Sequence, residues 1–139
     1  MLASEVGFVW WQVGALSHLA EFALELERAG DAPKYIAQGL ALGHSINDRQ
    51  TTVWFLAQAA WLAALDGLAE RAGLLWGAVE ADEGRGRIGQ WEDQRDSYLA
   101  KLERVSGAEF EAGRAQGQQL TLDEAVSATL DGLPLHAAG

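Results

Sequence analysis

Histidines are the residues of this chain whose type could most readily support metal binding or acid–base catalysis. His18, His44 and His136 are dispersed, and no His-x-x-x-His pair or Glu-x-x-His motif occurs, so the spacing of a helical metal site is missing. Ser17 and His18 are adjacent, and because neighbouring helix residues point in different directions they cannot form a catalytic dyad. We therefore predict no metal, no cofactor and no catalytic residue, and hence no enzyme.

The carboxylates fall into small clusters near expected helix ends. Paired acid–base catalysis requires two carboxyl groups that converge in a cleft, and nothing in the sequence indicates such a cleft. Acidic residues near helix ends instead complement the helix dipole or lie on solvated faces. We expect this role for Glu80/Asp82/Glu83, Glu92/Asp93/Asp96 and Asp123/Glu124.

Three glycines, in the order Gly84-x-Gly86-x-x-Gly89, have the form of a dinucleotide-binding fingerprint. That motif binds a pyrophosphate where a strand precedes the glycines and a helix follows them. Here a helix is expected before the glycines and no strand is predicted, so we interpret the segment as a flexible connector.

Six tryptophans form the most unusual part of the composition. Trp10 and Trp11 are adjacent and point about 100° apart on a helix, so they cannot both face one core. We expect Trp11 and Trp91 to be exposed, whereas Trp54 and Trp61, seven residues apart, have the spacing of core residues. An exposed Trp10 or Trp11 would indicate a surface that a preceding repeat covers or that dimerises.

Helical periodicity supplies the elements that position these side chains. Expected ends include Ser4 as an N-cap and Pro33 in a first turn. Two capping boxes are expected, Ser106–Glu109 and Thr121–Glu124, and breaks are expected at Gly30-Asp31, Asn47-Asp48, Asp66-Gly67 and Gly132-Leu133-Pro134. The predicted helices span residues 4–29, 32–46, 49–65, 68–82 and 91–104, with a short helix after Ser106 and another from Thr121 to about Leu130.

The first four predicted helices form two similar pairs. Leu19-Ala20 matches Leu56-Ala57, 37 residues later, and Tyr35-Ile36 matches Leu74-Leu75, 39 residues later. Helix–turn–helix repeats of this length are typical of tetratricopeptide-like α-solenoids. We predict an all-α fold in one continuous domain, with two repeats over residues 1–83 and a connector with two or three C-terminal capping helices over residues 84–139.

A groove is the predicted binding site. In such a solenoid the first helix of each pair lines the concave surface, and the offset of 37 aligns Glu21 with Gln58. The predicted lining combines aromatic and polar side chains, which suits a peptide or a small ligand. The predicted site residues are Trp11, His18, Glu21, Trp54 and Gln58.

Composition excludes several classes of function. Ten Lys and Arg against twenty Asp and Glu give a net charge of −10, which disfavours contact with nucleic acid. The absence of Cys excludes disulfide scaffolds and thiol catalysis. No basic leader precedes an apolar stretch and no run reaches about 18 apolar residues, so we expect no membrane association and a cytoplasmic location.

Several phrases occur in order from Leu68 to Leu130: residues 69–80 (AERAGLLWGAVE), Arg95-x-x-Tyr98, Phe110, and residues 119–126 (QLTLDEAV). This segment resembles the end of the helical-repeat region of large LuxR-family and AfsR-like bacterial transcriptional regulators. In that family the repeats form a regulatory arm, while an ATPase domain and a DNA-binding domain lie elsewhere. The chain departs from the family's Pro-rich connector at residues 88–91 (IGQW), and it contains no Walker motif and no basic recognition helix.

The resemblance implies a fragment or a stand-alone copy of a sensing arm. We therefore expect a non-catalytic interaction module that binds a protein partner, or a second copy of itself, through the groove. The alternative is a module that binds a small-molecule effector among Trp11, His18, Trp54 and Gln58.

Overall fold

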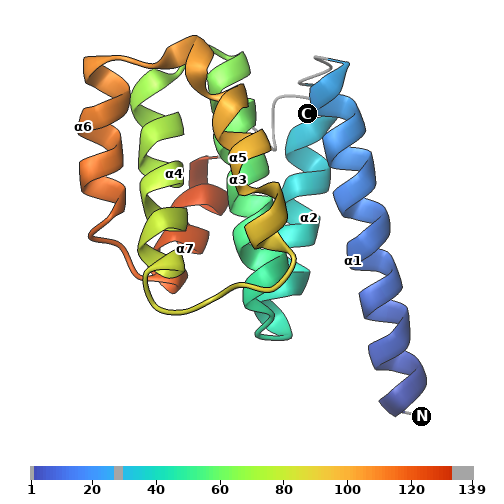
Figure 1. The fold of residues 1–139 in the computed structure, drawn as a ribbon. Helices are drawn as coiled ribbons and strands as arrows, with labels where there is room; N and C mark the ends of the chain where they lie inside the picture. Colours follow the sequence, from blue (N-terminus) through green and yellow to red (C-terminus); the bar gives the residue numbers. More distant parts are fainter. Residues whose placement is uncertain (1, 27–29, 133–139) are drawn as a thin grey trace.

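Helices make up the regular structure of this computed structural model, which describes residues 2–26 and 30–132, with side chains from Trp10 onward (Figure 1). No strand occurs within these ranges, which confirms the all-α class. The helices are α1 (Leu2–Glu25), α2 (Ala32–Ser45), α3 (Arg49–Leu65), α4 (Ala69–Glu83), α5 (Trp91–Lys101), α6 (Ala108–Gly117) and α7 (Leu122–Gly132), with a 3-10 turn at Glu103–Val105.

Local capping chemistry explains several helix ends. The Asp48 side chain accepts a hydrogen bond from the Thr51 N–H at 2.9 Å, and Asn47 before it has a φ of 55°. The capping box at α7 forms in both directions, because the Thr121 N–H donates to the Glu124 side chain and the Glu124 N–H donates to Thr121 Oγ1. These ends were correctly predicted.

Two predicted N-caps were wrong. Helix α1 begins at Leu2, so Ser4 lies inside it, because Leu2 and Ala3 are themselves good helix formers. Helix α6 begins after Gly107, whose φ of 145° suits glycine, and it has no side-chain cap, so the box at Ser106 does not form. The end of α1 at Glu25 precedes the predicted one; residues 27–29 and 133–139, with the expected stop at Pro134, lie outside the described residues.

Helix α3 lies at the centre of the molecule. Helices α1 to α4 pack in chain order, and α3 also contacts α5 and α7 (Figure 1). Thirteen residues of α3 are buried, so this helix is apolar on nearly all sides. The core is therefore organised around α3, with α1 on one side and α4 on the other.

Helices α4 and α6 approach each other backbone to backbone. A Cβ added at Gly73 would lie 2.0 Å from the Phe110 carbonyl oxygen, and one at Gly77 would lie 2.1 Å from the Arg114 carbonyl oxygen. The contacts advance together along both chains, so the two helices run parallel (Figure 1). Small residues one turn apart allow this close packing, and the glycines at the contact are Gly73, Gly77, Gly113 and Gly117.

Trp91, expected to be exposed, is completely buried. Its ring lies 6.0 Å from that of Trp54, 6.1 Å from that of Trp76 and 5.5 Å from that of Tyr98, measured between centroids. Its indole N–H donates to Glu83 at 2.9 Å, so the polar atom also has a partner. The prediction failed because the connector before α5 turns this face of the helix onto α3 and α4.

Among the described residues, no helix combines the length and the apolar character that crossing a membrane requires.

Candidate functional site

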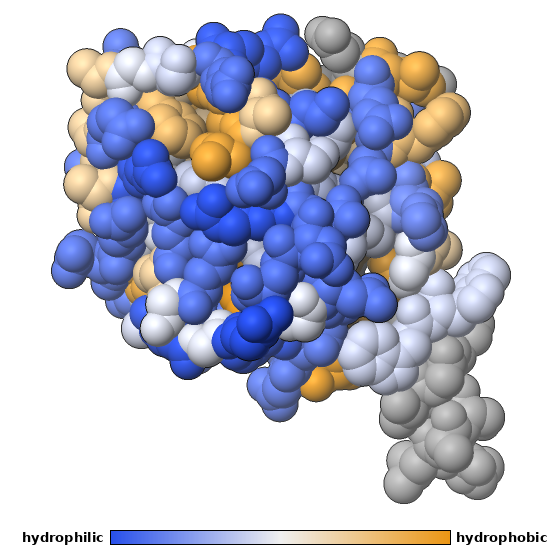
Figure 2. All heavy atoms as spheres, viewed as in Figure 1, coloured by the Kyte–Doolittle hydropathy of each residue, from blue (hydrophilic) through white to orange (hydrophobic). Residues whose placement is uncertain are grey.

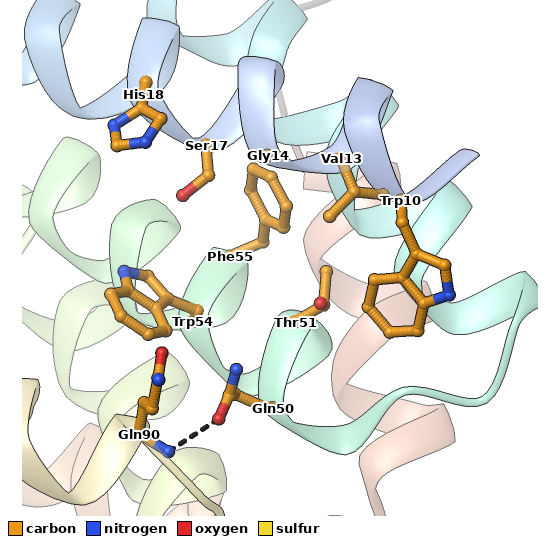
Figure 3. A pocket seen from close by; sticks show the side chains of 10 residues that line it. All are labelled: Trp10, Val13, Gly14, Ser17, His18, Gln50, Thr51, Trp54, Phe55 and Gln90. Carbon is orange, nitrogen blue, oxygen red and sulfur yellow. Dashed lines mark hydrogen bonds between the residues drawn. The ribbon is translucent and has the colours of Figure 1, made fainter. Parts of the chain in front are cut away.

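A groove of about 360 Å³ lies between α1 and the first half of α3, with the start of α5 at one end (Figure 3). Its described lining contains aromatic, small and uncharged polar side chains but no Lys, Arg, Asp or Glu. Gln50 and Gln90 are joined across one end, because the Gln90 N–H donates to the Gln50 side chain at 2.6 Å. The lining residues are Trp10, Val13, Gly14, Ser17, His18, Gln50, Thr51, Trp54, Phe55 and Gln90.

The structure places two of the five predicted site residues, His18 and Trp54, in this lining. Trp10 lies in the groove in place of Trp11, whose side chain is 72% exposed on another side of α1. Adjacent helix residues point about 100° apart, so one of the two indoles had to face away from the groove. The exposure predicted for Trp11 is confirmed, but the groove itself is lined without it.

The other two predicted residues, Glu21 and Gln58, meet Trp54 at the Tyr98 hydroxyl. The hydroxyl donates to Glu21 Oε1 at 2.5 Å and accepts hydrogen bonds from Trp54 Nε1 at 3.0 Å and Gln58 Nε2 at 3.3 Å. We call Tyr98, Glu21, Trp54 and Gln58 the Tyr98 cluster. It joins α1, α3 and α5 at one point beside the groove.

Burial fixes the ionisation state of Tyr98. Removal from water raises the pKa of the Tyr98 hydroxyl well above its ordinary value, and the hydrogen bond to Glu21 raises it further. Gln58 is fully buried, and its side-chain N–H also donates to the Ser17 carbonyl oxygen at 3.2 Å. Gln58 therefore holds α1 to α3 beneath the surface and does not line the groove.

A second depression, of about 240 Å³, lies beyond the Tyr98 cluster, between α1 and α5. It differs from the groove in chemistry, because charged side chains of both signs line it. The Tyr98 cluster therefore separates an uncharged aromatic groove from a charged depression. The lining of the depression is Glu21, Glu25, Trp61, Gln94, Ser97, Tyr98 and Lys101.

Ion pairs hold α5 and α6 against α4. Arg95 donates to Glu83 at 2.8 Å, and Arg114 binds both oxygens of Glu80 at 2.6 Å. Burial alone would raise the pKa of Glu80, but the hydrogen bonds and charge of Arg114, with a hydrogen bond from Gln118, outweigh it and lower that pKa. The Glu80 hydrogen bonds raise the pKa of Arg114 in turn.

The solvated role expected for Glu80, Asp82 and Glu83 was wrong. Asp82 is only 3% exposed and accepts hydrogen bonds from Arg49 at 2.9 Å and Arg85 at 3.2 Å. These three carboxylates lie at the C-terminal end of α4, where the helix dipole does not favour negative charge, so the arginines stabilise them instead. By contrast, the acidic residues of the first turns of α5 and α7 do lie where the dipole favours them.

The glycine-rich segment at residues 84–89 follows helix α4 and has no strand before it. Arg49 donates to the carbonyl oxygens of Gly86 and Arg87. Among the described side chains, those of residues 10–26 and 30–132, no group of three His, Asp or Glu could hold a metal ion. His44, one of the dispersed histidines, instead pairs with Asp123 at 2.7 Å, and His136 lies outside the described residues.

Comparisons with known proteins add no relative: no protein-family model, no curated protein and no solved structure matches this chain.

Sequence reasoning missed Tyr98 as the centre of the site. One signal was present, since Trp91 and Tyr98 are seven residues apart and so share a helix face, as Trp54 and Trp61 do. The two pairs pack against each other: the Trp54 ring lies against that of Trp91, and the Trp61 ring lies 5.7 Å from that of Tyr98, measured between centroids.

Proposed function

We propose that the chain is a non-catalytic interaction and sensing module of a bacterial transcriptional regulator. It binds a protein partner, or a second copy of itself, through the groove between α1 and α3. The resemblance of residues 68–130 to LuxR-family and AfsR-like regulators supports the regulatory setting. An immunoblot of source cells tests that setting, because a regulator of this kind is several times larger than 14.9 kDa.

The helix packing supports a tetratricopeptide-like solenoid. Helices α1–α2 and α3–α4 form the two repeats of this proposal, and α1 contacts α3 as first helices of successive repeats do. Helix α5 contacts α3 and α6 runs parallel to α4, so these two helices cap the second repeat. Helix α7 packs across α2, α3 and α4.

The uncharged aromatic lining of the groove carries the functional proposal. Tryptophan is enriched among the residues that dominate binding energy at protein interfaces, and Trp10 is 46% exposed here. Ser17, Gln50 and Gln90 provide neutral groups that can hydrogen-bond a peptide backbone. A chain of net charge −10 with an uncharged groove suits an apolar segment of a partner protein.

Site-specific photo-crosslinking in the source cells tests this function. A photoreactive residue at Gly14, where no side chain or neighbouring element lies within 4 Å of an added Cβ, should cross-link one discrete protein. The same residue at exposed Ser127 on α7 is the control position. The purified cross-linked protein should bind the native chain and bind the His18→Ala variant more weakly. Equal cross-linking from both positions would contradict the proposal.

A small-molecule effector is the second candidate, because the volume of the groove lies within the range of ligand sites. A thermal-shift screen with metabolites separates the two functions. A ligand present at 100 times its Kd should stabilise the folded chain by about 2.7 kcal/mol. Binding should also quench the fluorescence of Trp10 or Trp54. The His18→Ala substitution should reduce this quenching, because it weakens binding of the ligand.

A further inference from the structure

Helix α1 exposes a continuous apolar face that is separate from the groove. The residues of this outer face recur every three or four positions, so they share one side of the helix. Trp11 is 72% exposed, Phe22 is 62%, Leu26 is 50% and Leu19 is 45%. Figure 2 shows hydrophobic side chains on the upper part of the right-hand edge of the molecule, over α1. We define the outer face as Trp11, Ala15, Leu19, Phe22 and Leu26.

The equivalent face of α3 is buried. The 37-residue offset that relates the two helices carries Leu19 to Leu56 and Phe22 to Ala59. Four of the five counterparts lie on α3 and are at most 4% exposed, because neighbouring helices cover them: Thr52, Leu56, Ala59 and Ala63. The fifth, Asp48 for Trp11, is the half-buried N-cap of α3. The outer face of α1 is therefore a helix-packing surface that lacks its cover.

The size of the outer face fits the core of a dimer interface. Its four large side chains expose roughly 500 Å², given that one aromatic side chain alone can bury 150–250 Å². A stable dimer buries about 800 Å² on each partner, so these four side chains supply more than half of that area. Apolar patches of several hundred Å² are often functional interaction sites.

Charge favours this face over the rest of the surface. A chain of net charge −10 repels a second copy wherever acidic residues meet. Glu21 and Glu25 border the outer face, because they line a shallow depression together with Leu19 and Phe22. In an antiparallel pair centred beside residues 18 and 19, Glu21 would be level with Leu16 of the second copy and Glu25 with Gln12, so no two acidic side chains would lie directly opposite each other.

The spacing of the outer face is complementary to itself. If two α1 helices pack antiparallel about a twofold axis beside residues 18 and 19, Trp11 lies opposite Leu26 of the second copy. Ala15 then lies opposite Phe22 of the second copy, so a small residue faces a large one, and Leu19 lies next to the axis. We propose that a second copy of this chain covers the outer face, with the two α1 helices antiparallel.

Mass measurement over a concentration series tests the dimer. Light scattering should report a mass near twice 14.9 kDa for the native chain. Leu26→Glu should shift the protein to a monomer, whereas Leu68→Glu is the matched control, since both leucines are 50% exposed and Leu68 lies at the start of α4. Circular dichroism checks that both variants keep their helices. A native monomer at all concentrations, or equal loss of dimer in both variants, would overturn the proposal.

Cysteine cross-linking tests the antiparallel arrangement, and the chain has no native cysteine to interfere. Leu19→Cys should form a disulfide-linked dimer under mild oxidation, because this position lies beside the axis. Trp11→Cys should not, because its two copies would lie roughly 22 Å apart at 1.5 Å per residue. Efficient linkage through Trp11→Cys and not through Leu19→Cys would contradict the arrangement. A Gln50→Ala variant, altered on the α3 wall of the groove, that loses partner binding but stays dimeric separates this interface from the groove.

Discussion

The Tyr98 hydroxyl lies 2.5 Å from a Glu21 carboxylate oxygen, although 77 residues separate the two in the chain. This bond connects α5 to α1 over the central helix α3. This contact joins the two sides of the second depression, and it ties the α1 wall of the neighbouring groove to the last third of the chain.

Tyr98→Phe should destabilise the fold by about 1–3 kcal/mol. The substitution keeps the ring but leaves Trp54 Nε1, Gln58 Nε2 and Glu21 without the hydroxyl they share. Urea unfolding measures the change. Tyr35→Phe is the matched control, because Tyr35 is half-buried on α2 with no hydrogen bond to its hydroxyl among the described residues, and it should change stability by less than about 0.5 kcal/mol.

Alkaline pH should destabilise the native chain more than it destabilises the Tyr98→Phe variant. Burial and Glu21 raise the pKa of Tyr98 in the folded state above its unfolded value of 10.0. The stabilisation from Tyr98 is thus fully present below pH 10.0 and is lost as the pH rises above it, because the unfolded chain then releases a proton that the folded chain retains. Thermal unfolding at increasing pH should show a smaller decline for the variant, and equal declines would refute this role.

Acid should remove the stabilisation that Glu80 provides. The pKa of Glu80 is lowered in the folded state, so its contribution is present above the unfolded value of 4.5 and is lost as the pH falls below that value. Glu80→Gln should cost about 2 kcal/mol at neutral pH, because Arg114 and Arg95 lose a charged acceptor. The variant should also lose less stability on acidification. Glu109→Gln, exposed on α6, is the control.

Gly77→Ala should destabilise the chain by more than about 3 kcal/mol or prevent its folding. The added Cβ would lie 2.1 Å from the Arg114 carbonyl oxygen, so α4 and α6 would have to separate. Gly14→Ala is the control and should stabilise α1 by about 0.5–1 kcal/mol, because its Cβ meets nothing within 4 Å. Chemical denaturation of both variants measures the difference; similar values would show that the α4–α6 contact is not close.

Local signals predicted most helix boundaries but not the rotation of the helices. Asp48, Thr121 and Glu124 act through hydrogen bonds to nearby backbone, so their roles are visible in the sequence. Trp11 was assigned to the groove where the structure has Trp10, because α1 is apolar on several sides and its periodicity does not fix which side faces α3.

The candidate site was predicted in part for a related reason. Glu21 and Gln58 were expected together, and they do meet, but through a tyrosine that lies 40 residues beyond Gln58. Trp91 was misplaced because its burial depends on the path of the connector. Arg49 holds that path from α3, a contact that no local pattern of residues 84–90 reveals.

Arg49 also affects how the chain unfolds. Its guanidinium donates to Asp82 Oδ2 and to the carbonyl oxygens of Asp82, Gly86 and Arg87, so the start of α3 is bound to the segment that leads into α5. Linear repeat arrays often melt from their ends, one unit at a time. In this chain the segment that leads into α5 cannot detach without releasing contacts of the central helix α3, so we expect a single cooperative transition in heat and in denaturant.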